Sequence, residues 1–212
     1  MLGLLYKDLH TAKRELMMTG FLALCFVLFS VITGQKELLG PTIGVLISVG
    51  SLVPTYSIHY DKASGWNKFI CASPITRTQV ILSKYLAGFA SLLLINGLIV
   101  LENILMGSPM PAWAYPLLLS IMLLLQAVML PVCLKFGQNF GVAVFLVLVF
   151  FPVALLFLLN RLGVLTDAAI EGTFALIQQN ASLFGILGVL AVLVLYGVSF
   201  LITRRIYIRM EI

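Results

Sequence analysis

Few residues of this sequence could carry out chemistry, and they do not gather in the pattern of an active site. His59 and Asp61 stand two positions apart, which could bring an imidazole beside a carboxylate for acid and base catalysis. The alternative, that they are unrelated residues at the end of an apolar stretch, has more support because no positioned nucleophile or paired carboxylate accompanies them. We therefore predict no catalytic residues and no enzyme activity in this chain.

Hydrolysis of ATP and metal chemistry both lack their motifs. The sequence has no Gly-x-x-x-x-Gly-Lys-[Ser/Thr] segment, so it has no phosphate-binding loop of the Walker type. It also has no His-Glu-x-x-His segment and no cluster of Cys and His, so we predict no metal site and no cofactor in this chain. Any energy from ATP must be supplied by another chain.

Long apolar segments hold these few polar residues. The 212 residues are 61% hydrophobic and only 10% charged, so lipid must be the main solvent of the chain. A helix that crosses the hydrocarbon layer needs about 20 apolar residues. We predict an all-α integral membrane protein, a single transmembrane domain with six transmembrane helices. The spans are predicted at residues 17–34, 39–59, 79–105, 114–134, 139–160 and 183–203.

The basic residues predict the orientation of these spans. With six spans, both termini share one side of the membrane, and that side holds eleven of the 13 Lys and Arg residues. Because Lys and Arg concentrate on the cytoplasmic side, we predict a multi-pass protein of the cell membrane with both termini in the cytoplasm. The net charge of +5 follows from this bias and requires no nucleic-acid partner.

Residues 1–15 are predicted to form an amphipathic helix that lies in the cytoplasmic interface of the membrane. Leu5 and Leu9 recur at helical spacing, and the basic residues of the segment are Lys7, Lys13 and Arg14. Two interpretations remain open. The helix could be a membrane anchor with no further role, or it could be a docking surface for a soluble partner.

A short helix is predicted between the second and third spans. Asp61 is a suitable N-cap, and Trp66, Phe69 and Ile70 would then lie on one side of about three turns before Pro74 ends the helix. A hydrophobic ridge exposed to the cytosol needs a cover, so we predict that a partner docks there. The alternative is that the aromatic side chains fold back onto the lipid interface.

Three further polar features precede or lie within the third span. Thr76 and Gln79 form a T-x-x-Q capping box, which predicts the start of the third helix. Asn96 is expected to hold neighbouring helices together. Glu102 is expected near the outer interface, where a carboxylate that is solvated or paired with Arg161 is favoured over one that couples transport.

Small and polar side chains follow one face of the second span at spacings of three and four residues. They are Gly40, Gly44, Ser48, Ser51, Thr55 and His59. Such a stripe can allow helices to pack closely, or it can line a polar or amphipathic route through the membrane. The residues alone leave both interpretations open.

The polar segments resemble those of a known family. The chain opens with LLYKDL at residues 4–9, and the connection between the second and third spans reads DKASGW and then SPITRTQVILSKYL. Together with six spans, these segments resemble the membrane subunits of ABC-2 type exporters. The layout covers the whole chain, whereas the specific motif covers residues 61–86. Among such subunits, those of phenol-soluble-modulin and small antimicrobial-peptide exporters are the most similar.

The resemblance implies a type V exporter fold and several partners. It implies a second, identical membrane subunit and two copies of a separate ATPase subunit, which bind ATP and Mg²⁺. Residues 1–15 and a coupling helix at 61–73 would contact the ATPase. The residues assigned to coupling on this basis are Asp61, Lys62, Trp66, Phe69, Ile70 and Arg77.

The resemblance also places the route of the cargo between the two membrane subunits, along spans two and five. Short re-entrant helices are implied for the outer segment at 161–182. The residues assigned to the route are Ser48, Ser51, Thr55, His59, Phe145 and Phe151. The phenylalanines of span five would form an apolar wall that suits a hydrophobic or amphipathic cargo, such as a peptide.

The predicted function is therefore that of a permease subunit in an ATP-driven exporter of amphipathic peptides, with resistance to antimicrobial peptides as one outcome. Two alternatives remain. The chain could be a membrane-embedded enzyme that acts on lipid or peptide, or a scaffold or immunity protein that holds a partner without transporting it. An adjacent gene that encodes a Walker motif would favour the exporter.

Overall fold

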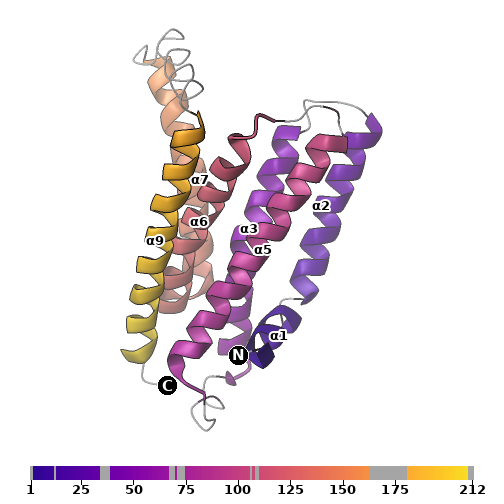
Figure 1. Cartoon of the computed structure of the whole chain (residues 1–212). Coiled ribbons are helices and arrows are strands. Elements are labelled where there is room, and N and C mark those ends of the chain that lie inside the picture. Colours follow the sequence, from indigo (N-terminus) through magenta and orange to yellow (C-terminus); the bar gives the residue numbers. More distant parts are fainter. Residues whose placement is uncertain are drawn as a thin grey trace.

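The chain forms a bundle of antiparallel α-helices in a computed structural model (Figure 1). The structure describes residues 2–11, 13–33, 39–66, 70, 75–105, 107, 110–162 and 181–209. The helices are α1 (Leu2–Thr11), α2 (Lys13–Thr33), α3 (Leu39–Ala63), α5 (Arg77–Leu105), α6 (Ala114–Phe136), α7 (Gln138–Arg161) and α9 (Ala181–Arg209). No strand occurs in these ranges, so the all-α prediction is confirmed for the described chain.

The long helices alternate in direction, and the short α1 lies at the same end of the bundle as the C-terminal end of α9 (Figure 1). Five helical segments are long and apolar enough to cross a membrane. They are Thr42–Ala63, Arg77–Leu105, Ala114–Phe136, Gln138–Leu159 and Gly185–Arg209. In α2 the comparable apolar stretch is the shorter Gly20–Phe29. The chain is thus a multi-pass membrane protein, and the sixth span remains a prediction.

Several boundaries near the α1 end differ from the predicted ones, and the last helix, for example, ends at Arg209 instead of residue 203. The N-terminal helix ends at Thr11, and Lys13 and Arg14 belong to α2. The second long helix continues to Ala63 instead of ending at residue 59. Asp61 therefore lies inside α3, and the prediction that it caps a new helix is wrong. Its carboxylate has basic partners from neighbouring helices, and these let the helix continue past it.

The capping box at the start of α5 is confirmed. The backbone N–H of Gln79 donates to the hydroxyl of Thr76 at 3.3 Å, and the backbone N–H of Thr76 donates to the side-chain oxygen of Gln79 at 3.0 Å. These reciprocal bonds satisfy donors that have no partner inside the helix. They fix the point at which the α3–α5 connection, residues 64–76, ends and the next long helix begins.

The core surrounds α6, which packs against α3, α5, α7 and α9. Met122, Leu123 and Met129 of α6 are fully buried. Between transmembrane helices the hydrophobic effect contributes little, because lipid is as apolar as leucine, so close packing and hydrogen bonds hold the bundle together. Asn96 contributes such a bond, since its amide donates to the carbonyl oxygen of Tyr115 at 3.1 Å and joins α5 to the start of α6. Its predicted role in helix packing is confirmed.

Hydroxyl groups join α5, α6 and α9 inside the bundle. The hydroxyl of Tyr85 lies 2.7 Å from that of Ser199 and 2.8 Å from that of Thr203. The hydroxyl of Ser199 also donates to a backbone carbonyl of α6, that of Ala127. Tyr196 donates to the side-chain oxygen of Gln126 at 3.1 Å. Because bulk water does not reach the hydrocarbon region of a bilayer, buried polar groups such as these need protein partners.

A close contact at Gly88 gives a first prediction. A Cβ at Gly88 would overlap the side-chain amide of Gln126, whereas a Cβ at Gly97 on the same helix would meet nothing within 4 Å. We expect Gly88→Ala to lower the free energy of unfolding by about 1–3 kcal/mol, as overpacking does. Gly97→Ala is expected to be neutral or slightly stabilising, because alanine favours helix over glycine. Unfolding of both variants by SDS in mixed micelles measures the difference, and equal stability would contradict the packing of α5 on α6.

Candidate functional site

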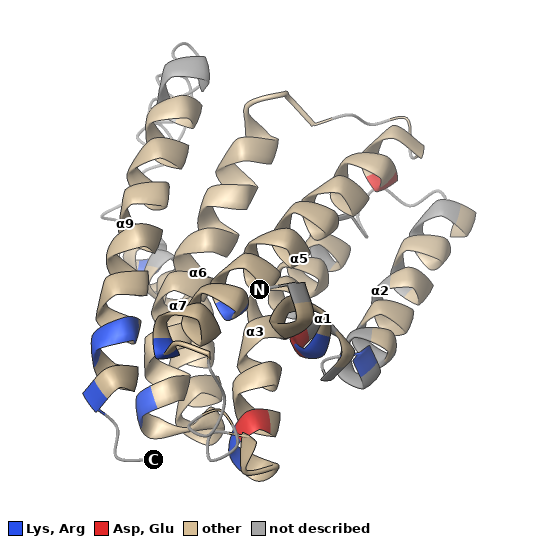
Figure 2. Ribbon diagram, turned by 60° about the horizontal axis from the view of Figure 1, so that its bottom comes forward, with Lys and Arg blue, Asp and Glu red and all other residues tan. Residues whose placement is uncertain are grey.

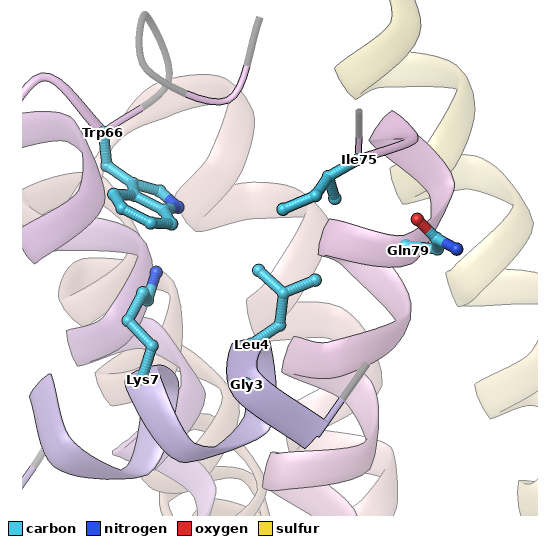
Figure 3. A pocket seen from close by; sticks show the side chains of 6 residues that line it. All are labelled: Gly3, Leu4, Lys7, Trp66, Ile75 and Gln79. Atoms are coloured by element: carbon cyan, nitrogen blue, oxygen red, sulfur yellow. The ribbon is translucent and has the colours of Figure 1, made fainter. Parts of the chain in front are cut away.

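A hollow opens at the α1 end of the bundle, between α1 and the α3–α5 connection. It has a volume of about 220 Å³ and is lined by Gly3, Leu4, Lys7, Trp66, Ile75 and Gln79. In Figure 3, Leu4 and Lys7 project from α1 towards the connection, and the Lys7 ammonium points at the Trp66 indole. That ammonium lies 4.6 Å from the centre of the indole ring, a cation–π contact. The two segments that were predicted to meet a partner therefore form one surface.

Beneath the hollow, four charged side chains from three helices form a closed cluster, which we call the charge cluster: Lys7 and Asp8 of α1, Asp61 of α3 and Lys84 of α5. Lys7 lies 3.0 Å from the carboxylate of Asp8 and 2.5 Å from that of Asp61. Lys84 lies 3.4 Å from Asp8 and 2.5 Å from Asp61. Each ammonium thus contacts both carboxylates, and the cluster has no net charge.

The charge cluster is mostly shielded from solvent. The side chains of Asp8, Asp61 and Lys84 are 2%, 6% and 4% exposed, whereas that of Lys7 is 22% exposed. Acidic and basic positions gather at this end of the bundle, while a further acidic position lies near the far end of α5 (Figure 2). Burial of charge is costly unless each charge has a partner, so the completeness of the pairing is what allows the cluster to exist.

Two serine hydroxyls complete the surroundings of Asp8. Ser57 donates to its carboxylate at 2.7 Å, and Ser83 donates at 2.8 Å. Burial raises the pKa of Asp8, but the charges of Lys84 and Lys7 and the two hydroxyls lower it by more, so the pKa lies below its usual 3.8. Asp8 is thus ionised at neutral pH. The stability that its ionisation contributes is present above pH 3.8 and is lost as the pH falls through the lowered pKa.

The ends of the α3–α5 connection are tied to two further helices. The ammonium of Lys62 donates to the carbonyl oxygen of Leu134 at 2.8 Å, close to the C-terminal end of α6. The guanidinium of Arg77 donates to the carbonyl oxygen of Ile208 at 2.9 Å, close to the C-terminal end of α9. Cations are favourable at these helix ends because the last carbonyl groups have no partner in the helix. A displacement of the connection would therefore reach both helices.

The structure places the predicted coupling residues in different surroundings. Trp66 is half-buried beside the hollow, but Ile70 is only 2% exposed and packs in the core with Ile58 and Tyr207. The predicted exposed ridge is therefore wrong for Ile70, because the core offers this side chain better burial than a surface would. Phe69 lies outside the described residues, as do 67–68 and 71–74.

The residues predicted for the interfacial helix also lie in different surroundings. Leu5 is half-buried on α1, Lys7 enters the charge cluster, and Lys13 is exposed on α2. The side chains of Leu9 and Arg14 lie outside the described part of the structure. The buried side of α1 is formed by Leu4 and Asp8, at a spacing of one helical turn. The helix thus faces the bundle with one apolar and one acidic residue.

The polar stripe of α3 is covered along its middle. Ser51 and Thr55 are 0% and 2% exposed, and their hydroxyls donate to backbone carbonyls of α3 itself. Ser48 is half-buried and His59 is exposed. His59 packs edge-on against Tyr60, and the described partners of Asp61 are Lys7 and Lys84. The side chains of His59 and Asp61 thus take separate surroundings and form no described pair.

The two phenylalanines assigned to the route lie on different sides of α7. Phe145 is 6% exposed and packs in the core of the bundle, so the wall predicted for span five does not include it. Phe151 is 62% exposed, as are its neighbours Phe150 and Phe157 to a similar degree. The segment 161–182 is described only at Arg161, Leu162 and the start of α9, so its predicted re-entrant helices lie outside the described residues.

Glu102 departs from its predicted environment. It is 1% exposed near the C-terminal end of α5, so a solvated carboxylate at the interface is the wrong expectation. The neighbouring Asn103 is fully buried as well, and its amide donates to the carbonyl oxygen of Ile99 at 2.8 Å. Polar groups inside the packed part of α5 therefore continue almost to the end of the helix.

Sequence reasoning missed Asp8 and Lys84, which complete the charge cluster. Both carry a signal that could have indicated them. Asp8 is the only acid in the first 14 residues, and Lys84 lies two turns inside an apolar span, where a lone charge is costly. An acid on one segment and a base within another are natural partners. Only the packing of α1 on α5 decides that these two meet.

The described charged residues beneath the hollow are paired with one another and form no group of metal ligands. Among the described residues, no three His, Cys, Asp or Glu side chains gather closely enough to hold a metal ion. The ammonium and carboxylate groups of the charge cluster are paired with one another, so none of them faces the hollow as a base with a vacant position. What the arrangement can do is transmit a displacement of α1 or of the connection to the long helices.

Fold and site together describe a multi-pass helical membrane protein with a hollow and a buried charge cluster at one end of its bundle. The chain belongs to the ABC-2 transporter family, because the family model described as "ABC-2 family transporter protein" matches residues 3–208. A search of curated proteins and a search of solved structures gave no match. Membership in this family identifies the chain as a permease component of an ABC transporter, a class whose members work with ABC ATPases.

Proposed function

We propose that this chain is the permease subunit of an ATP-driven exporter that moves hydrophobic or amphipathic peptides out of the cytoplasm. In this proposal two copies of a separate ATPase subunit bind ATP and Mg²⁺, and a second, identical membrane subunit completes the particle. The α1 end of the bundle faces the cytoplasm, and the particle resides in the cell membrane. The family match to residues 3–208 supports the transporter class.

The observation that carries this proposal is the shared surface at the hollow. Leu4 and Lys7 of α1 and Trp66 and Ile75 of the connection line one recess, although they lie about sixty residues or more apart in the chain. A tryptophan that is half-buried in such a recess is a typical anchor for a protein partner. Since Lys62 and Arg77 tie the connection to α6 and α9, a partner that pulls on Trp66 acts on the whole bundle.

Nucleotide binding by the ATPase can drive transport by shifting the permease from one conformation to another, and the surface at the hollow would transmit this shift. A partner changes the balance between two conformations only if it binds one of them more tightly. Two ATPase subunits that approach each other on binding ATP would displace both surfaces of a dimer at once. The connection would then move the ends of α3, α5, α6 and α9 together and switch access to the route.

The exposed side of α7 supports the class of cargo. Phe150, Phe151 and Phe157 are all more than 60% exposed in the protomer, at 63%, 62% and 69%. In a dimer with α7 and the exposed part of α3 at the seam, these rings would face an apolar or amphipathic molecule. A peptide of the phenol-soluble-modulin or antimicrobial type has that character, and it is the cargo that we propose.

The test of this function is reconstitution with an ABC ATPase from the same operon. We expect the two proteins to co-purify and to move a fluorescein-labelled amphipathic helical peptide into inverted proteoliposomes only when ATP is present. Trp66→Ala is expected to weaken ATPase binding by about 2 kcal/mol, roughly 30-fold in Kd, because a buried aromatic anchor is lost. Microscale thermophoresis in detergent measures the affinity.

Leu105→Ala is the matched control for this experiment, since Leu105 is 59% exposed at the opposite end of α5 from the hollow. Its affinity for the ATPase is expected to equal that of the wild type. Equal binding by wild type and Trp66→Ala would refute docking at the hollow. Peptide transport without any ATPase would refute the proposed function as a whole, and binding without transport would favour the scaffold alternative.

A further inference from the structure

The charge cluster can be divided into two complete pairs in two different ways. One division pairs Lys7 with Asp61 and Lys84 with Asp8, so both pairs join α1 to the long helices. The other pairs Lys7 with Asp8 within α1, and Lys84 with Asp61 between α5 and α3. All four contacts are present in the structure. The second division would survive if α1 moved away from the bundle.

This property is unusual for buried charges. Separation of two helices that are joined by a buried ion pair normally leaves one unpaired charge on each side, which is strongly unfavourable. Here α1 carries one cation and one anion, and the cluster residues of α3 and α5 likewise carry one of each. Departure of α1 therefore leaves a neutral pair on each side of the break. The free-energy cost of the movement therefore depends on which helix carries each charge, and not only on the number of ion pairs.

The hydrogen bonds around the cluster agree with such a movement. After departure of α1, Lys84 would keep Asp61 at 2.5 Å and the hydroxyl of Ser57 at 2.9 Å. Ser83 would keep its bond to the carbonyl oxygen of Val80 at 2.9 Å. On the other side, Asp8 would keep Lys7, whose side chain already reaches solvent at 22% exposure. Each buried group on the α3–α5 side thus retains a partner.

We propose that the charge cluster is a latch through which α1 docks on α3 and α5 and releases from them during each transport cycle, with Asp8 and Lys84 as positioning residues. This inference rests on the proposed function, because the ATPase is the partner that moves α1. Lys7 lies under Trp66 as well as in the cluster, so a partner that occupies the hollow reaches the latch directly. The exchange of ion-pair partners gives the permease two discrete positions of α1.

A double charge reversal separates the latch from an ordinary structural cluster. In Lys7→Glu with Asp61→Lys, α1 carries two anions and the α3–α5 side carries two cations, while the net charge of the protein stays at +5. Pairs between α1 and the bundle remain possible when α1 is docked. Pairs within each side do not, so release is prevented. We expect the reconstituted variant, at an ATPase concentration that saturates binding, to transport the labelled peptide at least about tenfold more slowly than the wild type.

Lys7→Gln is the control for loss of the cation that contacts the Trp66 ring. It leaves the pair of Lys84 with Asp61 in place and does not create like charges on either side, so its transport is expected to exceed that of the double reversal. A double reversal that transports at the wild-type rate would overturn the latch, since α1 of this variant cannot be released with its charges paired. Transport by Lys7→Gln as slow as that of the double reversal would overturn it as well.

Labelling of a cysteine tests the movement in the wild-type charge arrangement, even if the double reversal fails to assemble. Leu4 is 7% exposed on the docked side of α1, and the chain has three native cysteines that can be replaced by alanine. We expect Leu4→Cys in the assembled complex to react with a maleimide about tenfold faster in one nucleotide state than in the other, with and without a non-hydrolysable ATP analogue. Equal rates in both states would overturn the latch.

The outcomes separate the latch from the function on which it rests. If the wild-type complex transports but the double reversal transports equally well, the latch is refuted and the exporter stands. If the wild-type chain neither binds an ABC ATPase nor transports the peptide, the proposed function fails and the latch fails with it.

Discussion

Replacement of Lys84 by methionine is expected to lower the free energy of unfolding by about 3–5 kcal/mol. The variant leaves Asp8 and Asp61 in the charge cluster with Lys7 as the single remaining cation, so one buried carboxylate has no counter-charge. Methionine fills much the same volume as the lysine stem, so the loss reports on charge and little on packing. Unfolding in mixed micelles of dodecyl maltoside and SDS measures it.

A second substitution shows whether charge is the cause. Lys84→Met combined with Asp61→Asn restores neutrality, with Lys7 beside Asp8. We expect this double variant to recover most of the lost stability, as a coupled pair does in a double-mutant cycle. The gap between Lys84→Met and wild type should also narrow in acid, because protonation removes the charge that has no counter-charge in the variant. Additive losses at all pH values would contradict the cluster.

Replacement of Leu123 by alanine is expected to cost about 2–5 kcal/mol, because it creates a cavity at the centre of the bundle. Leu123 is 0% exposed on α6 and packs with Leu46, Leu92 and Ile95. Its neighbour Leu124 is 40% exposed and faces away from this core, so Leu124→Ala is a matched control on the same helix. Lipid chains fill the space that the control leaves, and its expected cost is below about 1 kcal/mol.

The comparison of these two leucines tests the rotation of α6 directly. The sequence of α6 is almost uniformly apolar, so its hydrophobic pattern does not distinguish the core side from the lipid side. Thermal or SDS unfolding of the pair would reveal the buried side without a further structure. A larger loss for Leu124→Ala than for Leu123→Ala would contradict the placement of the helix.

Length and composition were enough to predict much of this protein. An all-helical membrane bundle, the capping box at Thr76 and Gln79 and the packing role of Asn96 all follow from local rules that depend on a few neighbouring residues. The ABC-2 family was indicated by two short polar motifs, and the match over residues 3–208 confirms it. In a chain solvated by lipid, such local signals are strong because a polar residue among apolar ones is costly unless it has a partner or a function.

The errors arose where one segment meets another far along the chain. The residues adjacent to Asp61 in the sequence predict that it is an N-cap. In the structure, Lys7 and Lys84 pair with it and the helix continues to Ala63. Ile70 reads as part of an exposed ridge, yet it enters the core. Phe145 and Phe151 are alike in the sequence, and only the contact of α7 with α6 separates a core residue from an exposed one.

The sequence by itself determined the solvent of the chain, its helices and the sorting of its charges to one side, because these depend on composition and on spacing within single segments. Tertiary structure alone decided that the segment LLYKDL, which contains Asp8, lies against the segment SKYL, which contains Lys84. Together with Lys7 and Asp61, these two residues form a neutral cluster. The physical reason is that an ion pair in a low-dielectric interior requires a specific approach of side chains from three helices, and no local pattern encodes that approach.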